Sequence, residues 1–159
     1  MTIEDRLHAL EARLCAAEDQ LEIMRLLNSY GPLVDSGSAE EASRLWVEDG
    51  HYDVGGGPRF TPAELTAMYR DEGHMGLVQT GCSHLTAPPR ITVDGDAATA
   101  VAYSFVVLRE GERWFIFRAS INDWTLTRTE QGWRIVERFN RVLNGSPESH
   151  EVMRKVLAL

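Results

Sequence analysis

The chain carries little positive charge, since its 159 residues include 16 Lys and Arg against 24 Asp and Glu, for a formal net charge of −8. Nucleic acids and anionic membranes are bound by clustered basic side chains. The composition therefore predicts no nucleic acid and no membrane surface as a partner. Long hydrophobic runs are also lacking, because the longest apolar stretches fall far short of a bilayer span. We expect a soluble protein.

Cysteine is scarce. Cys15 and Cys82 are too few for a disulfide framework, and they do not have the spacing of metal ligands. The N-terminus is charged from Glu4 onward, which is unlike a signal peptide. These features predict a reduced, cytoplasmic protein.

Metal and phosphate motifs are missing as well. No short paired ligand spacing occurs among the histidines, which are His8, His51, His74, His84 and His150. The glycine run at 55–57 lacks the rest of a phosphate-binding motif and indicates a turn. We therefore expect neither a metal site nor a cofactor.

A length of 159 residues and a hydrophobic content of 43% suit a single domain, 1–159, with a real core. Residues 1–17 are expected to form a heptad-like helical arm, and residues 146–159 a short helical tail. Apolar residues recur in and after the arm at steps of four and three: Ile3, Leu7, Leu10, Leu14, Ala17 and Leu21. This pattern fits a coiled-coil arm that joins subunits and also a helix packed on its own domain, because a convincing coiled coil needs about 3 to 4 heptads.

The stretch LLNSYGPLVDSG, residues 26–37, places a phenol and a carboxylate at the end of an amphipathic helix. A 3.6-residue stripe runs through Ile23, Leu26, Leu27, Tyr30, Leu33 and Val34 and points Tyr30 inward. Asp35 lies off this stripe, on the flank of Met24 and Asn28. Asp35 either hydrogen-bonds its own backbone in an Asp-Ser-Gly turn or faces a cavity, and periodicity leaves both alternatives open.

Two further helix starts have capping-box spacing, Ser38 with Glu41 and Thr61 with Glu64. Pro62, at the first helical position, supports the second start. Between the two, the segment HYDVGGG indicates a short strand and a glycine turn.

From Gly81 onward the chain changes to long runs rich in Val, Ile, Thr and aromatic residues. The DGD, REGER and TEQG turns between the later runs are too short for crossover helices, so we predict an antiparallel meander. Helices followed by such strands predict an α+β fold, with a curved antiparallel sheet wrapped around the N-terminal helices. This geometry can enclose an internal pocket.

Several polar residues of the predicted strands are candidates for that pocket. His84 stands at a strand start, Asn122 shares one strand face with Arg118, and Arg138 shares another with Asn140. Each has an ordinary explanation. A lone histidine near apolar neighbours is more often structural, arginines often form a salt-bridged sheet surface, and an asparagine can bond a neighbouring loop.

Taken together, these segments resemble a known family. The resemblance lies in the segments LLNSYGPLVDSG, AEEASRLWVEDGHYDVGG, SHLTAPPRITVDGDAATAVAYSFVV and INDWTLTRTEQGWRIVERFNRVLNG. They are similar to the SnoaL-like branch of the nuclear transport factor two superfamily. The resemblance runs from about Glu18 to Gly145 and is close in pattern to scytalone dehydratase, bile-acid dehydratase and hexachlorocyclohexane dehydrochlorinase. It implies a cone-shaped α+β barrel whose pocket serves dehydration, isomerisation, cyclisation, dehydrohalogenation or plain binding.

The resemblance also implies site residues. The family has a helix aspartate that holds a strand histidine, and it also has a helix tyrosine and a last-strand arginine. By this resemblance the catalytic candidates here are, in the same order, Asp35, His84, Tyr30 and Arg138. A bulge in the last strand would exchange Arg138 for its neighbour. The substrate-binding candidates are Asn122, Asn140, Trp46, Tyr52 and Met68.

The expected function is a cofactor-independent lyase (dehydratase) or isomerase that acts on a small hydrophobic, cyclic hydroxy-carbonyl compound by Asp-His acid/base catalysis. The alternative is a non-catalytic small-molecule-binding or assembly module with a vestigial pocket. The resemblance further implies a homo-oligomer, dimer or trimer, with the outer sheet face and the terminal helix as contacts.

Overall fold

The computed structural model describes residues 1–158, and Leu159, the last residue of the predicted tail, lies outside them. The helices are α1 (Ile3–Asp35), α2 (Ala39–Ser43), α3 (Pro62–Arg70), α4 (Glu72–Thr80) and α5 (Pro147–Arg154), with a 3-10 turn η1 (Lys155–Ala158) after α5. The strands are β1 (Trp46–Asp53), β2 (Arg59–Phe60), β3 (Cys82–Thr86), β4 (Arg90–Asp94), β5 (Ala97–Glu110), β6 (Arg113–Thr129) and β7 (Gly132–Val142).

The strands form one curved sheet in the order β2-β1-β7-β6-β5-β3, and β4 pairs with the same edge of β5 as β3 does. The predicted α+β class and the antiparallel meander, which is β5-β6-β7, are confirmed. β1 runs parallel to β7, a pairing that the sequence did not indicate. Pro88 and Pro89 separate β3 from β4, because proline has no N–H to donate to a ladder.

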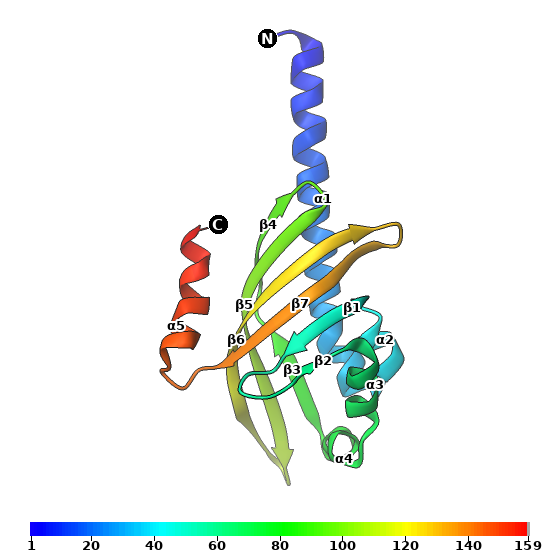
Figure 1. Ribbon diagram of the computed structural model, residues 1–159, viewed down its shortest axis with the longest axis vertical. Coiled ribbons are helices and arrows are strands. Elements are labelled where there is room, and N and C mark those ends of the chain that lie inside the picture. The colour runs from blue at the N-terminus through cyan, green and yellow to red at the C-terminus, as the bar shows by residue number, and fades with distance from the viewer. Residues whose placement is uncertain (159) are drawn as a thin grey trace.

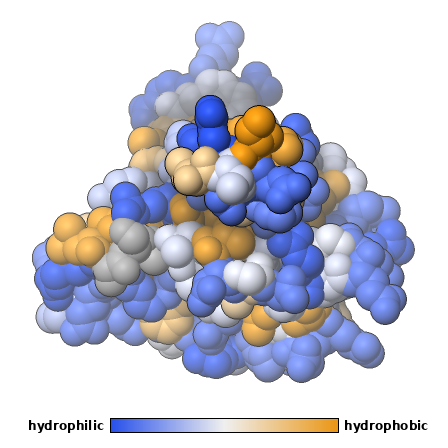
Figure 2. All heavy atoms as spheres, turned by 90° about the horizontal axis from the view of Figure 1, so that it is seen from above, coloured by the Kyte–Doolittle hydropathy of each residue, from blue (hydrophilic) through white to orange (hydrophobic). Residues whose placement is uncertain are grey.

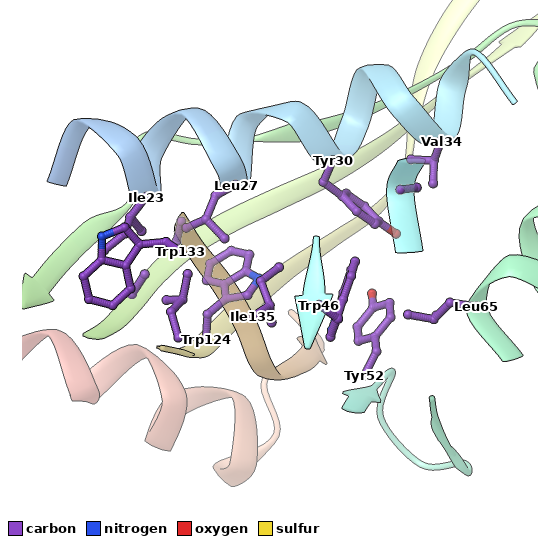
Figure 3. Packing of buried hydrophobic residues seen from close by; sticks show 14 of the residues in the cluster. Ile23, Leu27, Tyr30, Val34, Trp46, Tyr52, Leu65, Trp124, Trp133 and Ile135 are labelled. Atoms are coloured by element: carbon purple, nitrogen blue, oxygen red, sulfur yellow. The ribbon is translucent and has the colours of Figure 1, made fainter. Parts of the chain in front are cut away.

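One face of α1 lies on this sheet (Figures 1 and 3). Ile23, Leu27, Tyr30 and Val34 are buried there, as the 3.6-residue stripe predicts. Before Asp19 every residue of α1 is exposed, and this part of the helix projects beyond the sheet as a straight arm (Figure 1). The helix therefore has a packed half, which ends at the pocket, and a free half.

Bulges determine which β7 side chains point inward. Leu126 pairs with Ile135 and Thr125 with Glu137, so Val136 is an extra residue in β7. Ile135 and Arg138 then face the same side although they are three residues apart, because a bulge shifts the two-residue alternation by one. Without the bulge, Glu137 would take the inward place of Arg138.

The two predicted capping boxes differ in outcome. At α3, Thr61 accepts from the backbone N–H of Glu64, and the Glu64 carboxylate accepts from the N–H of Thr61 at 2.7 Å, so the prediction is confirmed. At α2, Ser38 is the N-cap residue, but its side chain makes no capping bond, so the predicted box with Glu41 is wrong. Its hydroxyl instead pairs with that of Ser36 at 2.9 Å, because α2 follows α1 after a short turn.

The C-terminal tail forms a helix where it was predicted, with Ser146 as the N-cap of α5. Val152 is buried against Val101 and Ile121 on the outer face of the chain's own sheet. The terminal helix and the outer sheet face, which were expected to contact other subunits, thus contact each other within one chain. Among the described residues, no helix is both long enough and apolar enough to cross a membrane.

Gly31 lets α1 approach β3 at the pocket. A Cβ atom on Gly31 would overlap the carbonyl oxygen of His84. We expect Gly31→Ala to lower the free energy of unfolding by about 3 kcal/mol, because a backbone atom cannot move aside cheaply. Thermal unfolding measures the effect.

Gly76→Ala is the matched control, because Gly76 is also helical and a Cβ there meets no atom within 4 Å. The control is expected to unfold at the wild-type temperature or above it, since alanine favours helix over glycine by up to about 1 kcal/mol. Equal midpoints for the Gly31 variant and the wild type would contradict the close approach of α1 and β3.

Candidate active site

Asp35, the last residue of α1, holds His84 of β3 with both carboxylate oxygens. Oδ1 accepts from the ring Nδ1 at 2.6 Å, and Oδ2 accepts from the backbone N–H of His84 at 2.7 Å. The carboxylate thus bonds across to the strand rather than to its own turn. An ionised carboxylate only accepts, so Nδ1 carries the proton and Nε2 of a neutral ring has a free lone pair.

The ionisation of this site follows from its contacts. Burial opposes charge on Asp35, but the hydrogen bonds from the His84 ring and backbone outweigh it, and the pKa of Asp35 lies below its ordinary value. Burial, together with a 3.3 Å hydrogen bond to Asp35, raises the pKa of the Cys82 thiol to about 12. At neutral pH Asp35 is therefore an anion, and Cys82 is a neutral donor to it.

Arg138 of β7 lies opposite, and only 4% of it is exposed. Its guanidinium carbon lies 4.4 Å from the ring centre of Tyr30 and 4.5 Å from that of Tyr52. Its Nε donates to Oδ1 of Asn122 at 2.9 Å. Aromatic faces and an amide oxygen thus hold the cation in place.

Among residues 1–158, no carboxylate lies within ion-pair distance of Arg138, although the guanidinium remains protonated at all ordinary pH values. A buried charge without a counter-ion is costly, and proteins usually pair it. This arrangement leaves an unneutralised positive charge on the wall of the pocket, which suits a ligand atom that is or becomes negative.

A pocket lies between His84 and Arg138. Its walls come from α1 and from strands β1, β3, β5, β6 and β7, and they include Tyr30, Tyr52, His84, Thr86, Ser104, Arg118 and Arg138. The free volume is about 10 Å³, room for about one water molecule. A larger ligand enters only if side chains of the wall move aside.

Two tyrosines extend the site inward. Tyr69 of α3 donates its hydroxyl proton to the hydroxyl of Tyr30 at 3.2 Å. The Tyr30 proton is then available to another acceptor. Burial raises the pKa of Tyr69 well above its ordinary value, so the Tyr69 hydroxyl keeps its proton.

The structure brings the four catalytic candidates together, because Tyr30, His84 and Arg138 line one pocket and Asp35 bonds His84. The substrate-binding candidates are more dispersed. Tyr52 lines the pocket, whereas Asn122 and Asn140 lie one layer behind it, where Asn140 Nδ2 donates to Asn122 Oδ1 at 2.7 Å. Trp46 and Met68 pack in or against the core rather than on the pocket wall.

Sequence reasoning did not select Arg118, Thr86, Ser104 or Tyr69. Arg118 shares the inward face of β6 with Asn122, so the alternation that marked Asn122 also marked Arg118. Thr86 lies two residues from His84 on the same face of β3, which was a similar signal. No sequence signal paired Tyr69 with Tyr30, because their contact joins different helices.

Asp35, Cys82 and His84 also bring one oxygen, one sulfur and one nitrogen ligand atom within 4.8 Å of one another. Short ligand spacing could not reveal this group, because its members come from two elements. The fit to a metal is poor, since a metal needs the thiolate and the high pKa of Cys82 opposes it. The same atoms already satisfy one another by hydrogen bonds.

The fold and this site agree with comparisons to known proteins. The profile of the SnoaL-like domain matches residues 16–139. The chain belongs to the SnoaL-like family. Membership confirms the resemblance recognised in the sequence. The sheet is curved around the N-terminal helices as predicted, but it is not closed into a barrel. No curated protein matches the chain.

Solved structures support the same assignment. An NTF2-like protein with a cystatin-like fold from Novosphingobium aromaticivorans is 42% identical, with 92% of this chain and 96% of that chain covered and a TM-score of 0.89. A protein of unknown function from Mycobacterium tuberculosis is 23% identical, with 87% and 86% covered and a TM-score of 0.69. A second N. aromaticivorans protein, named provisionally as an aromatic ring hydroxylase, is 20% identical, with 80% and 90% covered and a TM-score of 0.66. The last two likenesses show the fold alone.

Proposed function

We propose that this SnoaL-like protein is a cofactor-independent lyase, of the dehydratase type, or an isomerase that acts on a small, hydrophobic, cyclic hydroxy-carbonyl compound. The observation that carries the proposal is the 2.6 Å bond between Asp35 and His84 on a pocket that also contains the buried, unneutralised Arg138. A base and a positive charge on one small pocket suit the removal of a proton from carbon beside a carbonyl group.

In the first step, His84 Nε2 takes the proton from the carbon next to the substrate carbonyl. The electron pair of that C–H bond moves into a new C=C bond, and the carbonyl electrons move onto oxygen to form an enolate. Asp35 stabilises the imidazolium through Nδ1, and Arg138 with the Tyr30 hydroxyl stabilises the enolate oxygen.

In the second step, the enolate electrons return and expel the hydroxyl group from the next carbon. The imidazolium of His84 gives its proton to the departing oxygen, so the products are water and an unsaturated carbonyl compound. Where the substrate has a C=C bond at the next two carbons in place of the leaving group, loss of the proton gives a dienolate, and His84 returns the proton to its far carbon. The C=C bond then stands beside the carbonyl group, and the product is an isomer. Neither route uses an electron acceptor or donor.

The proposal of an apolar substrate is supported by part of the pocket wall. Tyr30, Tyr52 and Val106 are buried and line the pocket. Such walls favour an apolar ring and leave the carbonyl and hydroxyl groups to His84, Tyr30 and Arg138. Both cysteines are free, which agrees with a reducing compartment, and we propose the cytoplasm as the place of action.

A second candidate is a non-catalytic binding or assembly module. The observation in its favour is the free volume of about 10 Å³, which is small for an organic ligand. Under this alternative the Asp35-His84 contact serves to fasten α1 to β3.

Proton exchange distinguishes the two candidates without knowledge of the natural substrate. The protein is incubated in D2O with cyclic β-hydroxy ketones, of which 3-hydroxycyclohexanone is the simplest. Proton NMR follows loss of the hydrogens next to the carbonyl, and ultraviolet absorbance follows formation of the enone. We expect exchange or enone formation above the buffer rate, and Asp35→Asn should lower it about 10²-fold or more, because the amide favours the wrong ring tautomer.

Cys82→Ser is the matched control, since it keeps a donor to the Asp35 carboxylate while replacing the thiol. It should retain exchange within a few-fold of the wild type. Saturable binding of these ketones without exchange by the wild type would favour the binding module, and equal exchange by Asp35→Asn would exclude the dyad mechanism.

A further inference from the structure

A row of large apolar side chains runs along the free half of α1 and one turn beyond it, and all of them are exposed. Ile3, Leu7, Leu10, Leu14 and Leu21 are between 46% and 77% exposed. Figure 2, which looks down on the free end of α1, shows hydrophobic side chains standing beside hydrophilic ones there. Most helical stability in proteins comes from packing of an apolar face, and an exposed apolar row marks an interaction site.

The row follows coiled-coil geometry. With Leu7, Leu14 and Leu21 at heptad positions a, the d positions are Ile3, Leu10, Ala17 and Met24. The next a position is Asn28, which is exposed on α1. A single asparagine at position a is a device that sets the register between identical helices.

The charged residues beside the row indicate the partner and its direction. In the free half of α1, position e is Glu4, Glu11 and Glu18, and position g is Arg6 and Arg13. In a parallel pair, g lies beside the e residue five positions later on the partner, so Arg6 meets Glu11 and Arg13 meets Glu18. In an antiparallel pair, g meets g and e meets e, and like charges repel.

These charges have no partners within their own helix. The neighbours of Arg6 and Arg13 at three and four residues carry no acid, and those of Glu11 carry neither Lys nor Arg. Among the described residues, Arg6, Arg13, Glu11 and Glu18 form no ion pair. The charge pattern is therefore complementary to a second copy and not to the helix itself.

The position of the domain leaves room for such a copy. Asp19, Ile23 and Leu27 face the chain's own sheet, and Asp19 binds Arg128 at 2.8 Å and Trp133 Nε1 at 3.2 Å. The a and d side chains lie on the opposite side of α1, where Leu21, Met24 and Asn28 line a groove of about 520 Å³. The apolar row and this groove form one continuous face of α1. If two copies pair through this face, the rest of each domain lies on the outer side of the paired helices (Figure 1).

We propose that the row formed by Ile3, Leu7, Leu10, Leu14, Ala17 and Leu21 binds the same row of a second copy of this chain, as a parallel, in-register, two-stranded coiled coil. The match of g to e charges across the pair fixes its direction. The two pockets lie at the far end of α1 from the free arms, so the pairing tethers two sites without closing either.

Disulfide trapping tests both the pairing and its direction. Full-length Cys15→Ser is the background, into which Ala17→Cys is placed at position d or Ala16→Cys at the neighbouring position c. Position d side chains of parallel helices meet, whereas position c side chains point apart. Under mild oxidation we expect at least tenfold more covalent dimer from Ala17→Cys than from Ala16→Cys, and none from the background above trace.

A charge exchange tests the partner. One variant carries Arg6→Glu and Arg13→Glu, and the other carries Glu11→Arg and Glu18→Arg, each with the Ala17→Cys reporter. Each alone should lose most of the covalent dimer, because like charges then face each other, and an equal mixture should restore it as a heterodimer. These residues are exposed and outside the domain, so unchanged thermal midpoints will verify folding.

Equal trapping at Ala16→Cys and Ala17→Cys, or no trapping at either, would overturn the proposal. Trapping that persists in each charge variant alone would overturn the charge-directed pairing. Sedimentation of the untrapped wild type should show no monomer at micromolar concentration, and a species of three chains held by the arms would overturn the two-stranded arrangement.

Discussion

His84→Gln is expected to lower kcat/KM on any cyclic β-hydroxy ketone that the protein dehydrates by about 10² to 10⁴-fold, the usual contribution of a positioned general base. Glutamine keeps a polar group of similar reach but cannot take a proton at neutral pH. Because the backbone N–H of His84 still bonds Asp35, the fold should be preserved. Steady-state kinetics and a thermal midpoint measured on the same sample separate the two effects.

His74→Gln is the control. The His74 ring lies 6.0 Å from that of His84, but its Nε2 is paired with the backbone oxygen of Val34 at 3.0 Å, and it does not line the pocket. Activity within a few-fold of the wild type is expected. If both variants lost activity equally, the loss would report on packing near α4 and not on a base at His84. Partial recovery of a His84→Ala variant with added imidazole would connect the effect to the ring.

Arg138→Met is expected to separate stability from activity. The methionine fills much of the same space and removes a buried charge that has no carboxylate partner in residues 1–158. Replacing a buried ion by an apolar side chain is often neutral or stabilising by about 1 to 4 kcal/mol. The thermal midpoint should therefore stay the same or rise. Turnover should fall by about 10² to 10³-fold, because a donor to the enolate oxygen is lost.

The control is Arg128→Met, which removes a cation that lies 4.6 Å from the Trp133 ring centre but is paired with Asp19 and Asp96 far from the pocket. It should keep full turnover and lose a little stability. A clearly lower midpoint for Arg138→Met would show that the cation holds the tyrosines together, and unchanged turnover would remove Arg138 from the mechanism.

Most of the fold could be predicted from the periodicity and the turn residues of the sequence. The stripe from Ile23 to Val34 determines which side of α1 is buried, and short turns between β-rich runs determine an antiparallel meander. The parallel pairing of β1 with β7 was not predictable, because it joins segments far apart in the chain and leaves no local signal. The absent capping bond at Ser38 has a local cause, since the Ser36 hydroxyl, two residues earlier, pairs with the Ser38 hydroxyl.

The candidate site, too, could be predicted only in part from the sequence. Alternation along β6 put Asn122 and Arg118 on one face, but their depth differs, since Asn122 is buried and supports Arg138 while Arg118 reaches the pocket. The place of Arg138 depended on the bulge at Val136, because one extra residue reverses every inward side chain that follows it. From the sequence we could expect a bulge to exchange Arg138 for its neighbour, but we could not locate the bulge.

The sequence by itself determined the family, the α+β class, the apolar row of the arm and the identity of the residues Asp35 and His84, because these depend on local pattern and on residue type. Only the tertiary structure decided that Asp35 turns to His84 rather than to its own backbone, that Arg138 is buried without a carboxylate, and that the arm stands free. The reason is physical: these outcomes depend on contacts between elements distant in sequence, where neighbouring side chains, bulges and burial decide what each group meets.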